Sequence, residues 1–114
     1  MSSITVGELW RLVFASESTL VAGAGGLDRE MTWPAVLRTR PPAFQSLKGG
    51  EILLISLENL RLLDPSLSLS RLLQSVLRMA VSAVAVVGNI EVPARELADR
   101  EKLPLFQLSA TVHL

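Results

Sequence analysis

The clearest apolar pattern in the chain is the run of four apolar residues from Ile52 to Ile55. It follows the double glycine at positions 49 and 50 and ends at Ser56. A strand with one face in water alternates apolar and polar residues, whereas a strand buried on both faces reads as a continuous apolar run. The pattern therefore predicts a short strand in the interior of an α/β sheet.

Upstream of this strand, the pattern predicts one helix and two strands. Thr5 and Glu8 have the spacing of a capping box, and apolar residues recur at helical spacing until about Phe14. Residues 19–22 predict a short strand that runs into a glycine-rich turn. Residues 31–37 predict a second strand, and the proline inside it places this strand at a sheet edge or breaks it.

Directly after the central strand, residues 57–64 predict an irregular, leucine-rich connection. A helix over residues 66–80 follows, with Asp64 or Ser66 as its cap and a proline in its first turn. Its apolar stripe consists of Leu69, Leu72, Leu73, Val76, Leu77 and Ala80.

The rest of the chain alternates between predicted strands and helices. It predicts a buried strand at residues 83–87, a helix at 93–102 with Leu97 as its apolar anchor, and a last strand at 105–108. Together with the central strand and the helix before them, these elements form two βαβ units, which give parallel strands. We expect an α/β fold of two or three layers, with a small, mainly parallel or mixed sheet.

The composition describes a single domain with much apolar surface to cover. The 114 residues fit one domain, and 49% of them are apolar, with a mean hydropathy of +0.41. Either each helix is buried on two of its sides, or a partner covers part of the apolar surface of the domain. The 11 basic and 11 acidic residues balance, whereas a nucleic-acid module normally has a basic excess.

Little in the sequence points to catalysis. There is no cysteine, which excludes disulfides and thiolate zinc sites, and the single histidine, His113, lies next to the C-terminus. The turn at residues 23–26 lacks the third glycine of a dinucleotide fingerprint, because position 28 is Asp28. We expect no enzyme activity, no cofactor and no metal.

No signal peptide is visible, and the longest small and apolar run, residues 79–87, is too short to span a bilayer. We therefore expect a cytoplasmic protein without a membrane partner.

Several short motifs are spread along the chain. They are Ile4-Thr5-Val6 with Glu8-Leu9, Val21-Ala22-Gly23, Gly26-Leu27-Asp28-Arg29, Trp33, Leu47-Lys48-Gly49-Gly50-Glu51-Ile52-Leu53-Leu54, Asp64-Pro65, Val84-Ala85-Val86-Val87-Gly88 and Leu103-Pro104-Leu105. In their order and spacing, these motifs resemble the N-terminal domain of PucR-type (purine catabolism regulator-like) transcriptional regulators.

The resemblance implies a regulatory input domain. In such regulators a C-terminal helix-turn-helix binds DNA, so residues 1–114 are expected to be one domain of a longer regulator, without its DNA-binding part. The fold also resembles the N-terminal domain of the Mur ligases, which is a fold-level analogy alone.

Two stretches depart from the usual pattern of these regulators. Members often carry His-x-Ser/Thr-Glu/Asp after the tryptophan, where this chain has Ala35-Val36-Leu37-Arg38, and Thr-Thr-Gly after the central strand, where it has Ile55-Ser56-Leu57. If those polar positions contact an effector, this domain binds a different one or none.

Open α/β sheets bind ligands beyond the carboxyl ends of their strands. The side chains expected there form a candidate site for a small-molecule effector: Arg38, Arg40, Ser56, Glu58, Asn59 and Asn89. The alternative for the two arginines is an exposed loop without a ligand.

A second hypothesis makes the domain an oligomerisation or signal-relay module without a ligand of its own. The leucines after the central strand exceed what one small core can easily cover, and we expect them to form a homodimer interface: Leu57, Leu60, Leu62 and Leu63. The alternative is that this segment folds back and caps the sheet. The departures from the family pattern favour the relay module, and the family context favours the sensor.

Overall fold

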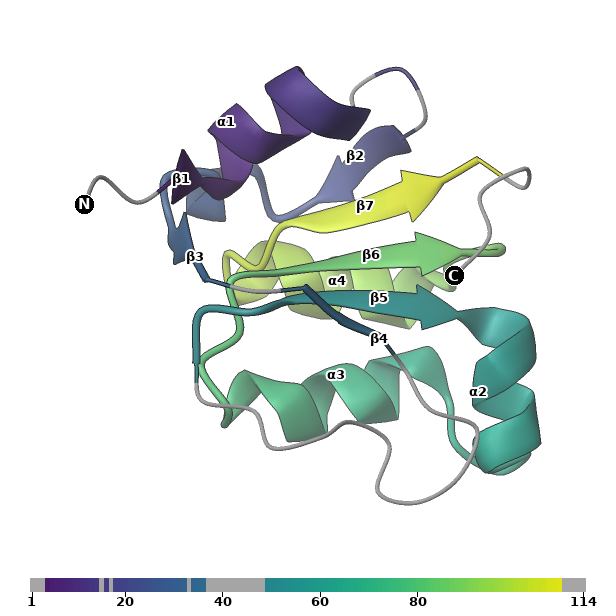
Figure 1. The fold of residues 1–114 in the computed structure, drawn as a ribbon. Helices are drawn as coiled ribbons and strands as arrows, with labels where there is room; N and C mark the ends of the chain where they lie inside the picture. Colours follow the sequence, from purple (N-terminus) through teal and green to yellow (C-terminus); the bar gives the residue numbers. More distant parts are fainter. Residues whose placement is uncertain (1–3, 15, 17, 33, 37–48, 110–114) are drawn as a thin grey trace.

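The computed structural model describes residues 4–14, 16, 18–32, 34–36 and 49–109. At its centre is a five-stranded sheet with the order β2-β7-β6-β5-β4 (Figure 1). The strands are β2 (Ser18–Ala22), β7 (Leu105–Leu108), β6 (Ala83–Val87), β5 (Ile52–Ser56) and β4 (Pro34–Val36). Neighbouring strands from β4 to β7 are parallel, and β2 is antiparallel to β7. This confirms the predicted α/β class and the interior position of the central strand.

The side chains of β5 alternate between the two faces of the sheet and are apolar on both. Leu53 and Ile55 are 0% exposed and belong to the larger core cluster. Ile52 belongs to a smaller cluster, against which the half-buried Leu54 packs. Both faces are therefore covered, as the continuous apolar run predicted.

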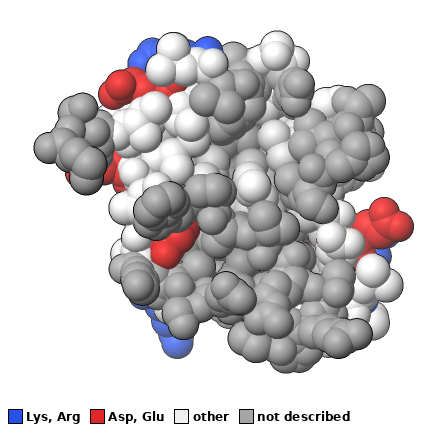
Figure 2. All heavy atoms as spheres, viewed as in Figure 1, with Lys and Arg blue, Asp and Glu red and all other residues white. Residues whose placement is uncertain are grey.

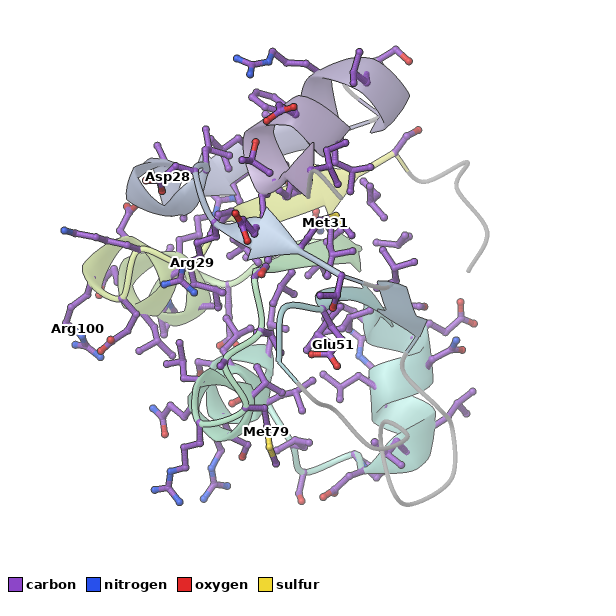
Figure 3. All side chains as sticks on the ribbon, turned by 60° about the vertical axis from the view of Figure 1, so that its left-hand side comes forward. Asp28, Arg29, Met31, Glu51, Met79 and Arg100 are labelled. Carbon is purple, nitrogen blue, oxygen red and sulfur yellow. The ribbon has the colours of Figure 1, made fainter. Side chains whose placement is uncertain are left out.

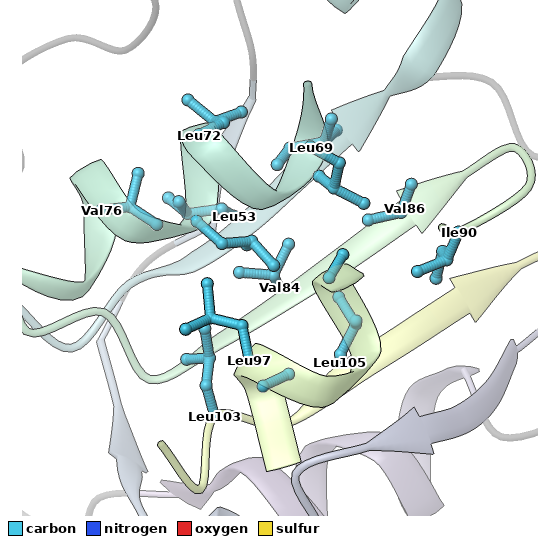
Figure 4. Packing of buried hydrophobic residues seen from close by; sticks show 14 of the residues in the cluster. Leu53, Leu69, Leu72, Val76, Val84, Val86, Ile90, Leu97, Leu103 and Leu105 are labelled. Carbon is cyan, nitrogen blue, oxygen red and sulfur yellow. The ribbon is translucent and has the colours of Figure 1, made fainter. Parts of the chain in front are cut away.

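Two helices cover one face of the sheet. The first, α3 (Leu69–Leu77), connects β5 to β6, and α4 (Val92–Arg100) connects β6 to β7. Their apolar side chains pack with those of the strands in the larger cluster, where Leu97 of α4 is buried as predicted (Figure 4). Both βαβ units are confirmed.

The beginning of α3 corrects a prediction. Its N-cap is Ser68, whose hydroxyl accepts a hydrogen bond from the Arg71 backbone N–H at 3.3 Å. Asp64 and Ser66 form a separate local turn, in which Asp64 Oδ1 accepts from the Ser66 hydroxyl at 2.7 Å and from its N–H at 3.0 Å. The prediction of a cap at these residues was wrong, because aspartate and serine support turns as readily as helix starts.

The segment after β5 is a helix, so the prediction of an irregular connection was also wrong. This helix, α2 (Leu57–Leu63), begins at its N-cap Ser56, whose hydroxyl accepts from the Asn59 N–H at 3.3 Å. A strand that turns directly into a helix leaves no polar linker, and this hid the boundary in the sequence.

The leucines of α2 differ in exposure. Leu60 is 3% exposed and belongs to the larger core cluster, and Leu57 and Leu63 pack partly buried against it. Leu62 is 67% exposed. The expected patch of exposed leucines is thus reduced to one side chain, because helical spacing turns the others toward the sheet.

The N-terminal segment covers the other face of the sheet. It contains α1 (Val6–Leu9) and a π-helix over Trp10–Phe14. One half of the predicted capping box is present, because the Thr5 hydroxyl accepts from the Glu8 N–H at 3.2 Å. The Glu8 carboxylate accepts from the same hydroxyl at 3.0 Å, in place of the Thr5 backbone N–H that a full capping box uses.

Small side chains on β6 let this segment lie close to the sheet. Ala83 and Ala85 are in the same cluster as Val6 and Phe106, which are both 0% exposed. The Phe106 ring lies 5.4 Å from the half-buried ring of Trp10. Phe106 is therefore a core residue of the smaller cluster.

The predicted strand at residues 31–37 is broken, as its proline suggested. Its first part, β3 (Glu30–Met31), pairs with β1 (Ile4–Thr5) in a separate two-stranded sheet. Its second part is β4, which begins at Pro34 and lies at an edge of the main sheet.

Within the part of the chain that the structure describes, no helix is long and apolar enough to cross a membrane.

Candidate functional site

The parallel strands β5 and β6 end side by side. Ser56, the last residue of β5, pairs with Val87, the last residue of β6. The chain then enters α2 after β5 and the segment Gly88-Asn89 after β6. The predicted region at the carboxyl ends of the strands is therefore formed by these two exits.

A cavity of about 220 Å³ opens beside these exits. Its walls come from α2, from the start of α3 and from the segment between β6 and α4; they consist of Leu57, Leu60, Arg61, Leu67, Ser68, Leu69, Asn89 and Glu91. Four of the eight are leucines. The other four are polar or charged, so the lining is more polar than in most small-molecule sites, and the cavity is smaller than the roughly 300–1,000 Å³ of drug-sized pockets.

Hydrogen bonds fix two of the polar groups. Glu91 Oε1 accepts from the Ser70 backbone N–H at 3.0 Å, and Ser68 Oγ accepts from the Arg71 N–H at 3.3 Å. Both contacts use amides at the beginning of α3, which have no partner within the helix. The Glu91 carboxylate thus takes the position that an anion would otherwise occupy.

Gly88 allows α2 to pack closely against the end of β6. Gly88 has a positive φ of 129°, and a Cβ there would lie 2.8 Å from Leu57 Cδ1. Its carbonyl oxygen accepts from Gln107 Nε2 at 3.1 Å. The absence of a side chain at this position lets Leu57 form a wall of the cavity.

The predicted site residues have different positions. Asn89 lines the cavity. Ser56 caps α2, Glu58 is exposed on its first turn, and Asn59 is half-buried, and none of the three is in the cavity wall. Arg38 and Arg40 lie outside the described residues, so both interpretations of them, as site residues and as an exposed loop, stay predictions.

Sequence reasoning missed three polar residues of the wall, namely Arg61, Ser68 and Glu91. Arg61 was missed because α2 was expected to be an irregular connection, and Ser68 was missed because the start of α3 was misplaced. Glu91 had a usable signal, since it lies two residues after Asn89 and directly before the helix start that Pro93 marks.

Among the described residues, no group of three or more histidine, cysteine, aspartate or glutamate side chains could hold a metal ion. On the face shown in Figure 2, the acidic and basic side chains that are coloured lie scattered, most of them near the margins, and do not gather into a patch of one sign.

A comparison with protein families matches residues 8–114 to the purine catabolism regulatory protein-like family, PucR. The chain belongs to this family. The match confirms the resemblance carried by the motifs, and it implies a regulatory domain of transcription regulators. No curated protein matches the chain.

Part of the PucR-like motif set serves packing. A Cβ at Gly23 would lie 1.8 Å from the Leu103 carbonyl oxygen, and one at Gly26 would lie 2.0 Å from that of Lys102. The Gly23 N–H also donates to Asp99 Oδ1 at 2.8 Å. The glycine-rich turn therefore fits closely against the α4–β7 turn.

Arg29 of the same motif set joins three segments of the PucR-like domain. It donates to the carbonyl oxygens of Val81 and Glu101, each at 3.1 Å. Figure 3 shows Arg29 beside the end of α4. These contacts tie the turn before β3 to the beginning of β6 and to the end of α4, so this arginine has a structural role.

Proposed function

We propose that this domain is the sensor of a bacterial transcription regulator and that it binds a small-molecule effector in the cavity beside α2. The observation that carries the proposal is the position of this cavity, at the carboxyl ends of two parallel strands in a member of a regulator family. Ligands of open α/β sheets bind at this edge. The regulator acts in the cytoplasm, and its DNA contacts lie in a segment other than this domain.

Of the predicted site residues, Asn89 lines the cavity, whereas Ser56, Glu58 and Asn59 lie outside its wall; the cavity adds Arg61, Ser68 and Glu91. Arg38 and Arg40 remain part of the proposal. The family description makes purines and their breakdown products natural first compounds for a screen.

A thermal-shift screen with purines, their breakdown products, nucleotides and amino acids would find a compound that binds. Chemical-shift mapping would then locate it, and perturbations around Asn89 and α2 are expected. Asn89→Ala should weaken binding, whereas Asn59→Ala, a matched change outside the cavity wall, should leave it unaltered. Perturbations confined to α1 and the π-helix would contradict the location, and a screen in which no compound binds would contradict the sensor function.

The second candidate function is dimerisation through α2, and the exposure of Leu62 favours it. Leu57, Leu60 and Leu63 support α2 from inside, so they would fix the helix that presents Leu62. Soluble homo-oligomers are most often two-fold dimers.

Light scattering at increasing protein concentration tests the dimer. Leu62→Glu should give a folded monomer, whereas Leu12→Glu, at a side chain that is 77% exposed on the π-helix, should leave the dimer intact. A wild-type chain that stays monomeric at high concentration would exclude this function.

A further inference from the structure

The cavity wall contains two charged side chains of opposite sign. Arg61 comes from α2 and is exposed, and Glu91 comes from the segment between β6 and α4 and is half-buried. They form no ion pair with each other; the one ion pair between described side chains joins Arg100 to Glu101. Both residues therefore line the same cavity without an ion pair between them.

The position of Glu91 is fixed from outside the cavity. Its Oε1 accepts from the Ser70 N–H, which holds the carboxylate at the beginning of α3. A carboxylate has two oxygens and about four acceptor positions, so this bond leaves acceptor capacity for a ligand. An ammonium group is well suited to such a partner, because hydrogen bonds between ionised groups are short and strong.

Arg61 is suited to a ligand group of the opposite charge, an anion. Its guanidinium presents five N–H donors, and no described residue forms a hydrogen bond or ion pair with it. A carboxylate matches this donor group, because a guanidinium can bind it bidentately.

Besides the two charged residues, the wall of this cavity of about 220 Å³ contains leucines, which give it apolar surface. A ligand that fits all three features has an apolar body, an ammonium group and a carboxylate. A nucleotide is larger and carries several negative charges, which the Glu91 carboxylate would repel. We infer that the cavity takes a small zwitterion of the aliphatic amino-acid class, an inference that rests on the sensor function proposed above.

Three probes with the same apolar body separate the two charged contacts. Leucine carries both groups, 4-methylpentanoate lacks the ammonium group, and 3-methylbutylamine lacks the carboxylate. Each is titrated at pH 7 into the isotope-labelled domain, and the dissociation constant is read from shifts around Asn89 and α2. Each truncated probe should bind about tenfold or more weakly than leucine, because a hydrogen bond to a charged group is lost.

Two variants assign the contacts. Glu91→Gln keeps an oxygen for the Ser70 N–H but removes the charge, and it should abolish the advantage of leucine over 4-methylpentanoate. Arg61→Gln should abolish the advantage of leucine over 3-methylbutylamine. The matched controls are Glu96→Gln and Arg95→Gln, two exposed positions on α4 outside the wall, and both should bind like the wild type.

The outcomes distinguish the ligand class from the sensor function. Equal binding of leucine and a truncated probe would overturn the zwitterion assignment. The zwitterion assignment would also be overturned if another class of compound bound at Asn89 and α2 while leucine did not bind. In both cases the sensor function would stand. If no compound of the screen and none of the three probes binds, both the assignment and the sensor function fail.

Discussion

Shortening Leu60 to alanine tests whether α2 is a true part of the core. Leu60 is 3% exposed within the larger cluster, whereas Leu62, two residues later in the same helix, is 67% exposed. Replacing a buried leucine by alanine costs about 2–5 kcal/mol, since apolar contacts are lost and a cavity remains. We expect about 2–3 kcal/mol for Leu60→Ala, because α2 is a short helix whose surroundings can partly collapse onto the gap.

Leu62→Ala is the matched control for this measurement. It makes the same chemical change with the same change in helix propensity, but at an exposed position, where substitutions alter stability by within about 0.5 kcal/mol. Urea unfolding followed by circular dichroism would give both free energies of unfolding. The Leu60 variant should also melt roughly 10–20 °C lower. Equal losses, or a larger loss for Leu62→Ala, would refute the orientation of α2.

Three further predictions concern the turns. Gly26→Ala should destabilise the fold by about 1–3 kcal/mol in urea unfolding, because its Cβ would meet the Lys102 carbonyl oxygen at 2.0 Å, whereas at Gly25 the nearest atom is a flexible side-chain carbon at 3.2 Å and alanine should be tolerated. Ala80→Gly should raise the free energy of unfolding by up to about 1 kcal/mol, because Ala80 has a φ of 55°, which glycine adopts without strain; an unchanged or lower melting temperature would contradict this. The hydrogen bond from the Ser66 side chain, followed by that from its backbone, lowers the pKa of Asp64 below 3.8, so its stabilising effect is present above that pH and is lost as the pH falls through the folded-state pKa. An NMR titration should show this pKa rising in Ser66→Ala, and an unchanged value would exclude the side-chain contact as the main cause.

The sequence predicted the strands better than the helix boundaries, and there is a physical reason for the difference. A strand buried on both faces must be apolar at every position, and this made β5 and β6 recognisable. Boundaries depend on which of several serines or aspartates caps the helix. Ser56, Ser66 and Ser68 are chemically equivalent candidates, and only packing decides among them.

The sequence placed the candidate site at the edge of the sheet where the cavity lies, but of the residues that line this cavity it named only Asn89 as a site residue. Topology alone places Ser56 and Asn89 at the carboxyl ends of β5 and β6. Which side chains line a cavity there depends on how α2 folds back. The sequence contains no strong signal for that, because the spacing of its leucines was equally compatible with a loop over the sheet.

The geometry of α2 connects the two proposed functions. Its inner side chains Leu57 and Leu60 line the cavity, and its outer side chain Leu62 faces solvent. A ligand that fills the cavity would pack against the inner side and reduce the freedom of the helix. A dimer contact through Leu62 would then form with less loss of conformational entropy, which is positive coupling between the two sites. On this reasoning, an effector should tighten the dimer, and by linkage the dimer should bind the effector more tightly by the same factor. A ligand that binds equally well to the wild type and to monomeric Leu62→Glu would show that α2 does not couple them.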